Sequence, residues 1–106
     1  MDKRFGTTDE LTELCAIVRD YANERNFNKC YEIISEAMKN YPHAPHPHNL
    51  MGIVFEMLND HIMAMKHFRA AWDLDPTYLP ARHNLHNFAA FFGVKKYIFD
   101  DADLPK

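Results

Sequence analysis

Two prolines, Pro42 and Pro76, lie 34 residues apart, and each follows a long stretch of helix-favouring residues. When the chain is shifted by this distance, bulky apolar residues fall mainly on bulky ones and small residues on small ones. The aligned pairs are Leu14 with His48, Ile17 with Met51, Val18 with Gly52, Tyr21 with Phe55, Cys30 with Ala64, Ile34 with Phe68, and Ala37 with Ala71. A period of this length is typical of stacked helical hairpins, in which each hairpin is covered by its neighbour.

Within each period, apolar residues recur at the spacing of one helix face, and polar turns or prolines interrupt the pattern. Thr7 and Glu10 have the spacing of a capping box, so the first helix is expected to begin at Thr7. Asp60 is the expected N-cap of the fourth helix and Gly93 the expected C-cap of the fifth. The helices predicted from these features cover residues 7–24, 27–40, 45–58, 61–74 and 78–92.

The repeat resembles the tetratricopeptide repeat, a helical hairpin of the same length. The second unit begins at Pro45 and departs from the family pattern only at His48. Its matching residues are Met51, Gly52, Phe55, Ala64, Phe68, Ala71 and Pro76. The first unit begins at Leu11 and departs at Val18 and Ile34. Its matching residues are Leu14, Ile17, Tyr21, Cys30, Ala37 and Pro42.

The resemblance implies an all-α fold, a right-handed superhelix of antiparallel hairpins with about five helices. The chain would be a single domain of residues 1–106. Its parts would be repeat 1 (11–44), repeat 2 (45–78), a capping helix (79–93) and a tail (94–106). Small residues such as Gly52 and Ala64 are expected where two helices approach closely, with Phe55 and Phe68 filling the space beside them.

In this family the first helix of each unit lines a concave groove that binds a peptide or helix of a partner protein. The groove positions carried over to this chain are Cys15, Arg19, Asn23, His46, Asn49, Ile53, Glu56, His83 and Asn87. Asn and His side chains can hydrogen-bond a peptide backbone, but the same residues could simply face water. At the positions that clamp a terminal carboxylate in chaperone-binding relatives, the chain has Cys15, Arg19, Leu50, Pro80 and Asn84. The chaperone role therefore loses support.

Composition, charge and the absence of known motifs exclude several classes of partner and function. The net charge of −3 and the scattered basic residues argue against nucleic acid as a partner. No apolar run is long enough to span a membrane, and the N-terminus lacks a signal-peptide pattern, so a cytoplasmic protein is expected. In that compartment Cys15 and Cys30 should be thiols. No catalytic motif is present, so we expect no enzyme activity and no cofactor.

The sequence therefore predicts an adaptor that binds another protein, with a self-associating structural subunit, for example a homodimer, as the alternative. Clustered histidines, His43, His46 and His48, raise the question of a metal site, but surface histidines at a helix entry are favoured. The acidic and aromatic tail could be a docking peptide or could enter the groove of a neighbouring copy. An unordered end is favoured, because chain termini are commonly loose.

Overall fold

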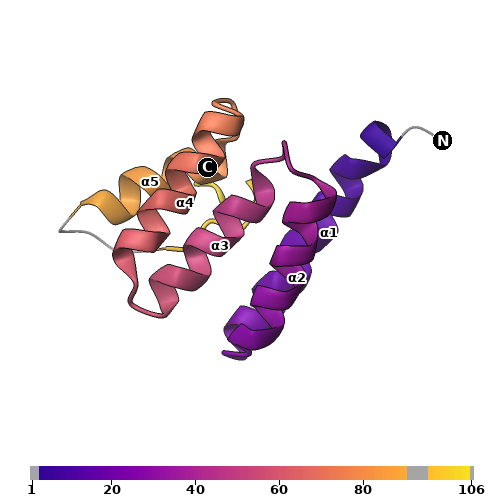
Figure 1. Ribbon diagram of the computed structural model, residues 1–106. Coiled ribbons are helices and arrows are strands. Elements are labelled where there is room, and N and C mark those ends of the chain that lie inside the picture. Colours follow the sequence, from indigo (N-terminus) through magenta and orange to yellow (C-terminus); the bar gives the residue numbers. More distant parts are fainter. Residues whose placement is uncertain (1–2, 91–95, 106) are drawn as a thin grey trace.

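The protein is described here by a computed structural model of residues 3–90 and 96–105, with only the backbone of residues 3–9. All regular secondary structure among the described residues is helical, with no strand, as the sequence predicted (Figure 1). The helices are α1 (Lys3–Asn23), α2 (Phe27–Asn40), α3 (His46–Met57), α4 (His61–Leu74) and α5 (Leu79–Ala89), followed by the short 3-10 turn η1 (Asp101–Asp103). None of these described helices is both long and apolar enough to cross a bilayer.

Most helix boundaries agree with those predicted, and α2 and α4 agree to the residue. The first helix differs, because α1 begins at Lys3 and Thr7 lies inside it. Thr7 is therefore not an N-cap, since the residues before it continue the helix. Helix α5 ends at Ala89, because Ala90 already has an extended backbone. The expected C-cap Gly93 lies outside the described residues.

The turn inside each hairpin has the same geometry at equivalent positions of the two units. Arg25 and Asn59, which are 34 residues apart, both adopt a positive φ, 59° and 64° respectively. The next residues, Asn26 and Asp60, cap α2 and α4 by accepting a hydrogen bond from the backbone N–H three residues later. The N-cap role predicted for Asp60 is confirmed. The sequence period is thus matched by a repeated turn in the backbone.

The helices pack mainly in the order in which they follow one another along the chain. Each helix contacts the next along the chain, and α3 also contacts both α1 and α5. In Figure 1, α2 lies in front of α1. The largest fully buried side chains of the core include Phe68, Ile34, Leu50 and Ile53. Helix α3 therefore packs against all four other helices.

Gly52 of α3 lies directly against the Phe68 side chain of α4. A Cβ atom added to Gly52 would lie 2.5 Å from Cε1 of Phe68, whose side chain is fully buried. Because protein interiors are close-packed, the buried Phe68 ring cannot move away from such a Cβ atom. The small residue expected at this position is thus required by the contact itself.

Candidate peptide-binding groove

The C-terminal segment lies against α1, α3 and α5. Residues 96–105, yellow in Figure 1, run behind α3 and α4. Hydrogen bonds join this segment to α1, α3 and α5. Ile98 and Phe99 are only 2% and 5% exposed. The preference for an unordered end is therefore wrong for these residues, because the segment buries apolar side chains and finds partners for its backbone.

Two fully buried amide side chains, Asn49 of α3 and Asn84 of α5, hold the backbone of Ile98. Both Nδ2 groups donate to the Ile98 carbonyl oxygen, at 3.0 Å from Asn49 and 2.9 Å from Asn84. Oδ1 of Asn84 accepts from the Ile98 N–H at 3.0 Å. Asn84 also donates to Oδ1 of Asn49 at 2.8 Å. We call this pair the amide clamp. It contacts only backbone atoms of residue 98, so its hydrogen bonds do not depend on the side chain there.

Arg19 of α1 binds the acidic part of the same segment. Its Nη2 atom lies 3.2 Å from Oδ1 of Asp100 and 3.0 Å from Oδ2 of Asp103. The guanidinium also lies over the ring of Phe99, 5.4 Å from its centroid. Oδ2 of Asp103 accepts the Phe99 N–H as well, at 3.0 Å, and so fixes the turn that brings both carboxylates to Arg19. Charge-assisted bonds of this kind are stronger than neutral ones when partly sheltered from water.

Stacked aromatic rings connect the segment to the helix core. Phe68 of α4 stacks on Phe88 of α5, with centroids 6.0 Å apart, and Phe88 stacks on Tyr97 at 5.3 Å. Tyr97 in turn meets the edge of Phe99, at 6.5 Å. Aromatic pairs at these separations add to the stabilisation from burial alone. Tyr97, Ile98 and Phe99 thus supply the apolar part of the contact, and Asp100 and Asp103 the polar part.

No family model, curated protein or solved structure matches this chain. The candidate site is therefore defined by the contacts of residues 96–105 with α1, α3 and α5.

The residues that the sequence assigned to the groove fall into two groups. Arg19 and Asn49 bind the C-terminal segment directly, as described above, and Asn87 donates to the Lys96 carbonyl oxygen at 3.3 Å. His83 lines a cavity of about 400 Å³ together with Leu104 and Pro105 of the segment. His46 lines a smaller cavity of about 150 Å³ beside Asp101 and Ala102. These five residues surround one segment.

The other four assigned residues have different surroundings. Cys15 and Ile53 are fully buried in the core, so neither presents a side chain to solvent. Glu56 bonds His61 on a neighbouring helix, with Oε2 3.0 Å from Nδ1. Asn23 is exposed at the end of α1. Burial, followed by the charge of Asp100, raises the pKa of Cys15 to about 12. Its thiol therefore stays protonated at neutral pH and is a poor nucleophile.

The smaller cavity lies beside two buried polar atoms. The His46 and Tyr78 rings pack with centroids 4.4 Å apart, and both residues line this cavity with Thr12, Asp100, Asp101 and Ala102. Within the described part of the chain, His46 Nδ1 has no hydrogen-bond partner, and the Tyr78 hydroxyl has none besides the Cys15 thiol. A buried polar atom without a partner costs about 1–3 kcal/mol. The C-terminal segment therefore fills this end of the groove incompletely.

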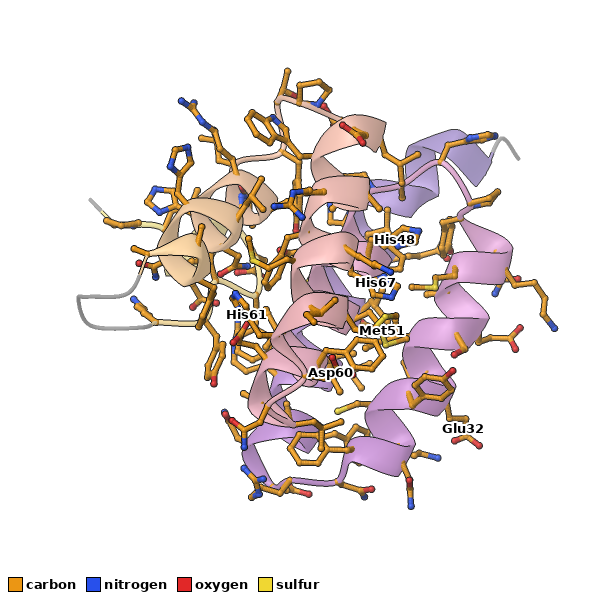
Figure 2. The ribbon with its side chains drawn as sticks, turned by 60° about the vertical axis from the view of Figure 1, so that its left-hand side comes forward. Glu32, His48, Met51, Asp60, His61 and His67 are labelled. Carbon is orange, nitrogen blue, oxygen red and sulfur yellow. The ribbon has the colours of Figure 1, made fainter. Side chains whose placement is uncertain are left out.

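The three clustered histidines do not converge. His43 is exposed, His46 packs on Tyr78, and His48 faces His67 of α4 with 3.1 Å between the two Nδ1 atoms. Figure 2 shows His48 and His67 side by side, with Met51 beneath them. Among the described residues, no group of three or more His, Cys, Asp or Glu side chains is placed to hold a metal ion.

The sequence analysis did not assign the residues of the C-terminal segment to any contact with the helices. Asn84 was noted only as a clamp position of the family, although it makes three of the hydrogen bonds described above. Phe99, Asp100 and Asp103 were assigned to an end that was favoured to be unordered, and Tyr97 and Ile98 were given no role. One available indication was complementarity, because the groove offered Arg19 as a cation and the tail offered aspartates beside aromatic residues.

Proposed function

We propose that this chain is an adaptor that binds an extended segment of a protein partner in the groove formed by α1, α3 and α5. The observation that carries the proposal is the amide clamp, in which Asn49 and Asn84 bind both backbone groups of Ile98. In an empty groove these buried amides would lose most of their partners, and unsatisfied buried amides are costly. The groove is therefore suited to an occupied state, and residues 96–105 fill it while no partner is bound.

The hydrogen bonds favour an extended peptide over a helix as the bound element. An internal residue of a helix uses its own N–H and C=O within the helix. The groove instead bonds the N–H and C=O of one residue, Ile98, from the side. This refines the expected ligand, a peptide or a helix, to an extended peptide.

The proposal includes the tetratricopeptide-like superhelix that the sequence led us to expect. It is supported by the equivalent turns at Arg25 and Asn59 and by the contacts of α3 with both α1 and α5. Repeat proteins of this kind commonly bind along the surface formed by equivalent helices of successive units. The buried Cys15 thiol remains protonated, so it does not support a function as a thiol nucleophile.

The test uses a full-length variant in which the C-terminal segment leaves the groove. Ile98→Asp together with Phe99→Asp places charges at two buried positions, and we call this double substitution the opened variant. A synthetic peptide with the sequence of residues 96–106, the tail peptide, is then added and binding is measured by fluorescence anisotropy. We expect saturable binding to the opened variant, with the helical circular dichroism unchanged.

Matched substitutions in the opened variant locate the binding surface. Arg19→Glu should weaken binding of the tail peptide at least about tenfold, because it replaces a charge-assisted contact by repulsion. Asn49→Ala should weaken it more mildly, since hydrogen bonds are lost without added repulsion. Lys66→Glu, on an exposed position of α4, should have little effect. If only Lys66→Glu reduced binding, the peptide would bind the outer face and the groove assignment would be wrong.

Self-association is a second candidate function, favoured by exposed apolar side chains. Tyr31, Leu58 and Ile62 are 58%, 48% and 71% exposed. Apolar side chains on a repeat surface can mark contacts between copies. Molar mass measured by light scattering over a wide concentration range separates the two candidates, because a structural subunit doubles its mass as concentration rises and an adaptor without partner does not.

A further inference from the structure

The groove contacts define the chemistry of a ligand position by position. The aromatic stack accepts rings at the positions of Tyr97 and Phe99, and Ile98 between them is almost completely buried. Arg19 then requires acidic residues at the positions of Asp100 and Asp103. The next residue, Asp101, is exposed, so this position imposes little selection on a ligand. A ligand pattern follows: aromatic, aliphatic, aromatic, acidic, and a second acidic residue three positions later.

We propose that the partner presents an extended segment with this pattern, and that it binds by displacing the chain's own residues 96–105. This inference rests on the proposed adaptor function and names the ligand of the same groove. The C-terminal segment is then an internal competitor, which lowers the affinity for any segment that fits less well. The occupant is a segment of another protein, bound at Arg19 and at the amide clamp.

A tethered segment has a high effective concentration, in the millimolar range for short connections. A successful competitor therefore needs a contact that the chain's own segment lacks. The cavity of about 150 Å³ beside Ala102 provides room for it, next to the unpartnered His46 Nδ1 and near the Tyr78 hydroxyl. A partner with a longer hydrogen-bonding side chain at the position of Ala102 would fill that space and satisfy one of these groups.

The same reasoning disfavours a second copy of this chain as the occupant. Another copy would offer the same residues 96–105 with the same alanine at position 102, so exchange between copies gains no contact within the groove. It would also forgo the advantage of the tether. A foreign segment of this pattern is therefore the better ligand.

The experiment compares three synthetic peptides on the opened variant and on the wild-type chain, both full length. They are the tail peptide, a reversed peptide with lysine in place of Asp100 and Asp103, and a filled peptide with glutamine in place of Ala102. On the opened variant we expect the tail peptide to bind at least about tenfold more tightly than the reversed peptide. When Arg19→Glu is added to the opened variant, this preference should be inverted, which a general loss of structure would not produce.

The possible outcomes distinguish a failure of this inference from a failure of the proposed function. Equal binding of the tail and reversed peptides would leave a peptide groove but overturn the acidic pattern, whereas no binding by any peptide would contradict both. The filled peptide should bind more tightly than the tail peptide, and this gain should vanish with Tyr78→Phe together with His46→Phe. Equal binding of these two peptides would overturn the role of the cavity.

Displacement is tested on the wild-type chain. The tail peptide should bind it at least about tenfold more weakly than the opened variant, because its groove is occupied. Equal affinity for the two proteins would overturn displacement. A wild-type dimer that separates when the tail peptide is added would show that a second copy is the occupant, and would contradict the choice of a foreign partner.

Discussion

Gly52 and Phe68 form a close contact between α3 and α4 that leaves no room for a side chain at position 52. The ring of Phe68 lies where the first side-chain carbon of any other residue at position 52 would stand. Gly52 is buried, as is the whole Phe68 side chain. The glycine is required here by the close approach of a ring and not by a special backbone conformation.

Replacing Gly52 should therefore destabilise the protein strongly. We expect Gly52→Leu to lower the free energy of unfolding by at least about 1 kcal/mol, since overpacking a core typically costs about 1–3 kcal/mol. Urea unfolding followed by circular dichroism measures the change. Phe68→Leu introduced into the Gly52→Leu protein should recover part of the loss by making room. A loss well below about 1 kcal/mol would show that α3 and α4 do not approach this closely.

The His48–His67 pair should make stability fall in mild acid. Burial lowers the pKa of both side chains, and for His67 the neighbouring His48 lowers it further. The unfolded chain then takes up protons at a higher pH than the folded chain. Stability is thus fully retained above about pH 6.5, the ordinary histidine value, and is lost as the pH falls through the lowered folded-state values.

Urea unfolding at about pH 7.5 and pH 5.5 tests this coupling. We expect His67→Gln to lose less stability between the two conditions than the wild-type chain, because one of the two half-buried rings is gone. His43→Gln, at an exposed position, is the matched control and should behave as the wild type does. The same loss in all three proteins would mean that the pair is not responsible.

At the scale of the elements, the two hairpins repeat each other in their turns more closely than in their side chains. The carbonyl oxygens of Tyr21 and Phe55 accept hydrogen bonds from the N–H groups of Asn26 and Asp60, respectively, both at 2.8 Å. These turns reverse the chain and fix how each second helix returns along the first. Asp60 then caps α4 through its side chain and joins the turn to the helix.

Removal of the cap should weaken the second hairpin. We expect Asp60→Ala to lower the free energy of unfolding by about 1 kcal/mol, as is usual for the loss of an N-cap side chain. Asp73→Ala, at an exposed position later in the same helix, removes an equal charge without removing a cap. Equal effects of the two substitutions in urea unfolding would indicate that charge, and not capping, stabilises α4.

The helices were predictable because their determinants are local. The turn residues, the prolines and the apolar spacing all act within a few residues, and they predicted the bounds of α2 and α4 to the residue. The start of α1 was predicted wrongly, because Thr7 and Glu10 have the spacing of a capping box although the helix continues before them. A local pattern allows a helix end but does not enforce it.

The candidate site could not be predicted in the same way, because it consists of contacts between distant parts of the chain. Arg19 was assigned to the groove from the sequence, but the groups it binds, Asp100 and Asp103, lie 81 and 84 residues away in sequence. Nothing local to residues 96–105 reveals that they return to α1. The burial of Ile98 between Asn49 and Asn84 follows only once α3 and α5 are placed side by side.

For the molecule as a whole, the C-terminal segment completes the core as well as the groove. Phe99 belongs to the same buried cluster as Cys15, Leu50 and Phe68. The chain therefore packs two helical hairpins, α5 and an inserted peptide into one unit. Release of that peptide would expose apolar surface, which a partner segment of similar chemistry would cover again.

Amide hydrogen exchange at Ile98 in the full-length wild-type chain tests this arrangement most directly. The Ile98 N–H is buried and donates to Asn84, so it should exchange at least about tenfold more slowly than in an unstructured peptide. Asn84→Ala should remove most of this protection, whereas Asn23→Ala, at an exposed position of α1, should leave it intact. An Ile98 amide that exchanges as fast as in the free tail peptide would contradict the account, because the groove would then not hold this segment.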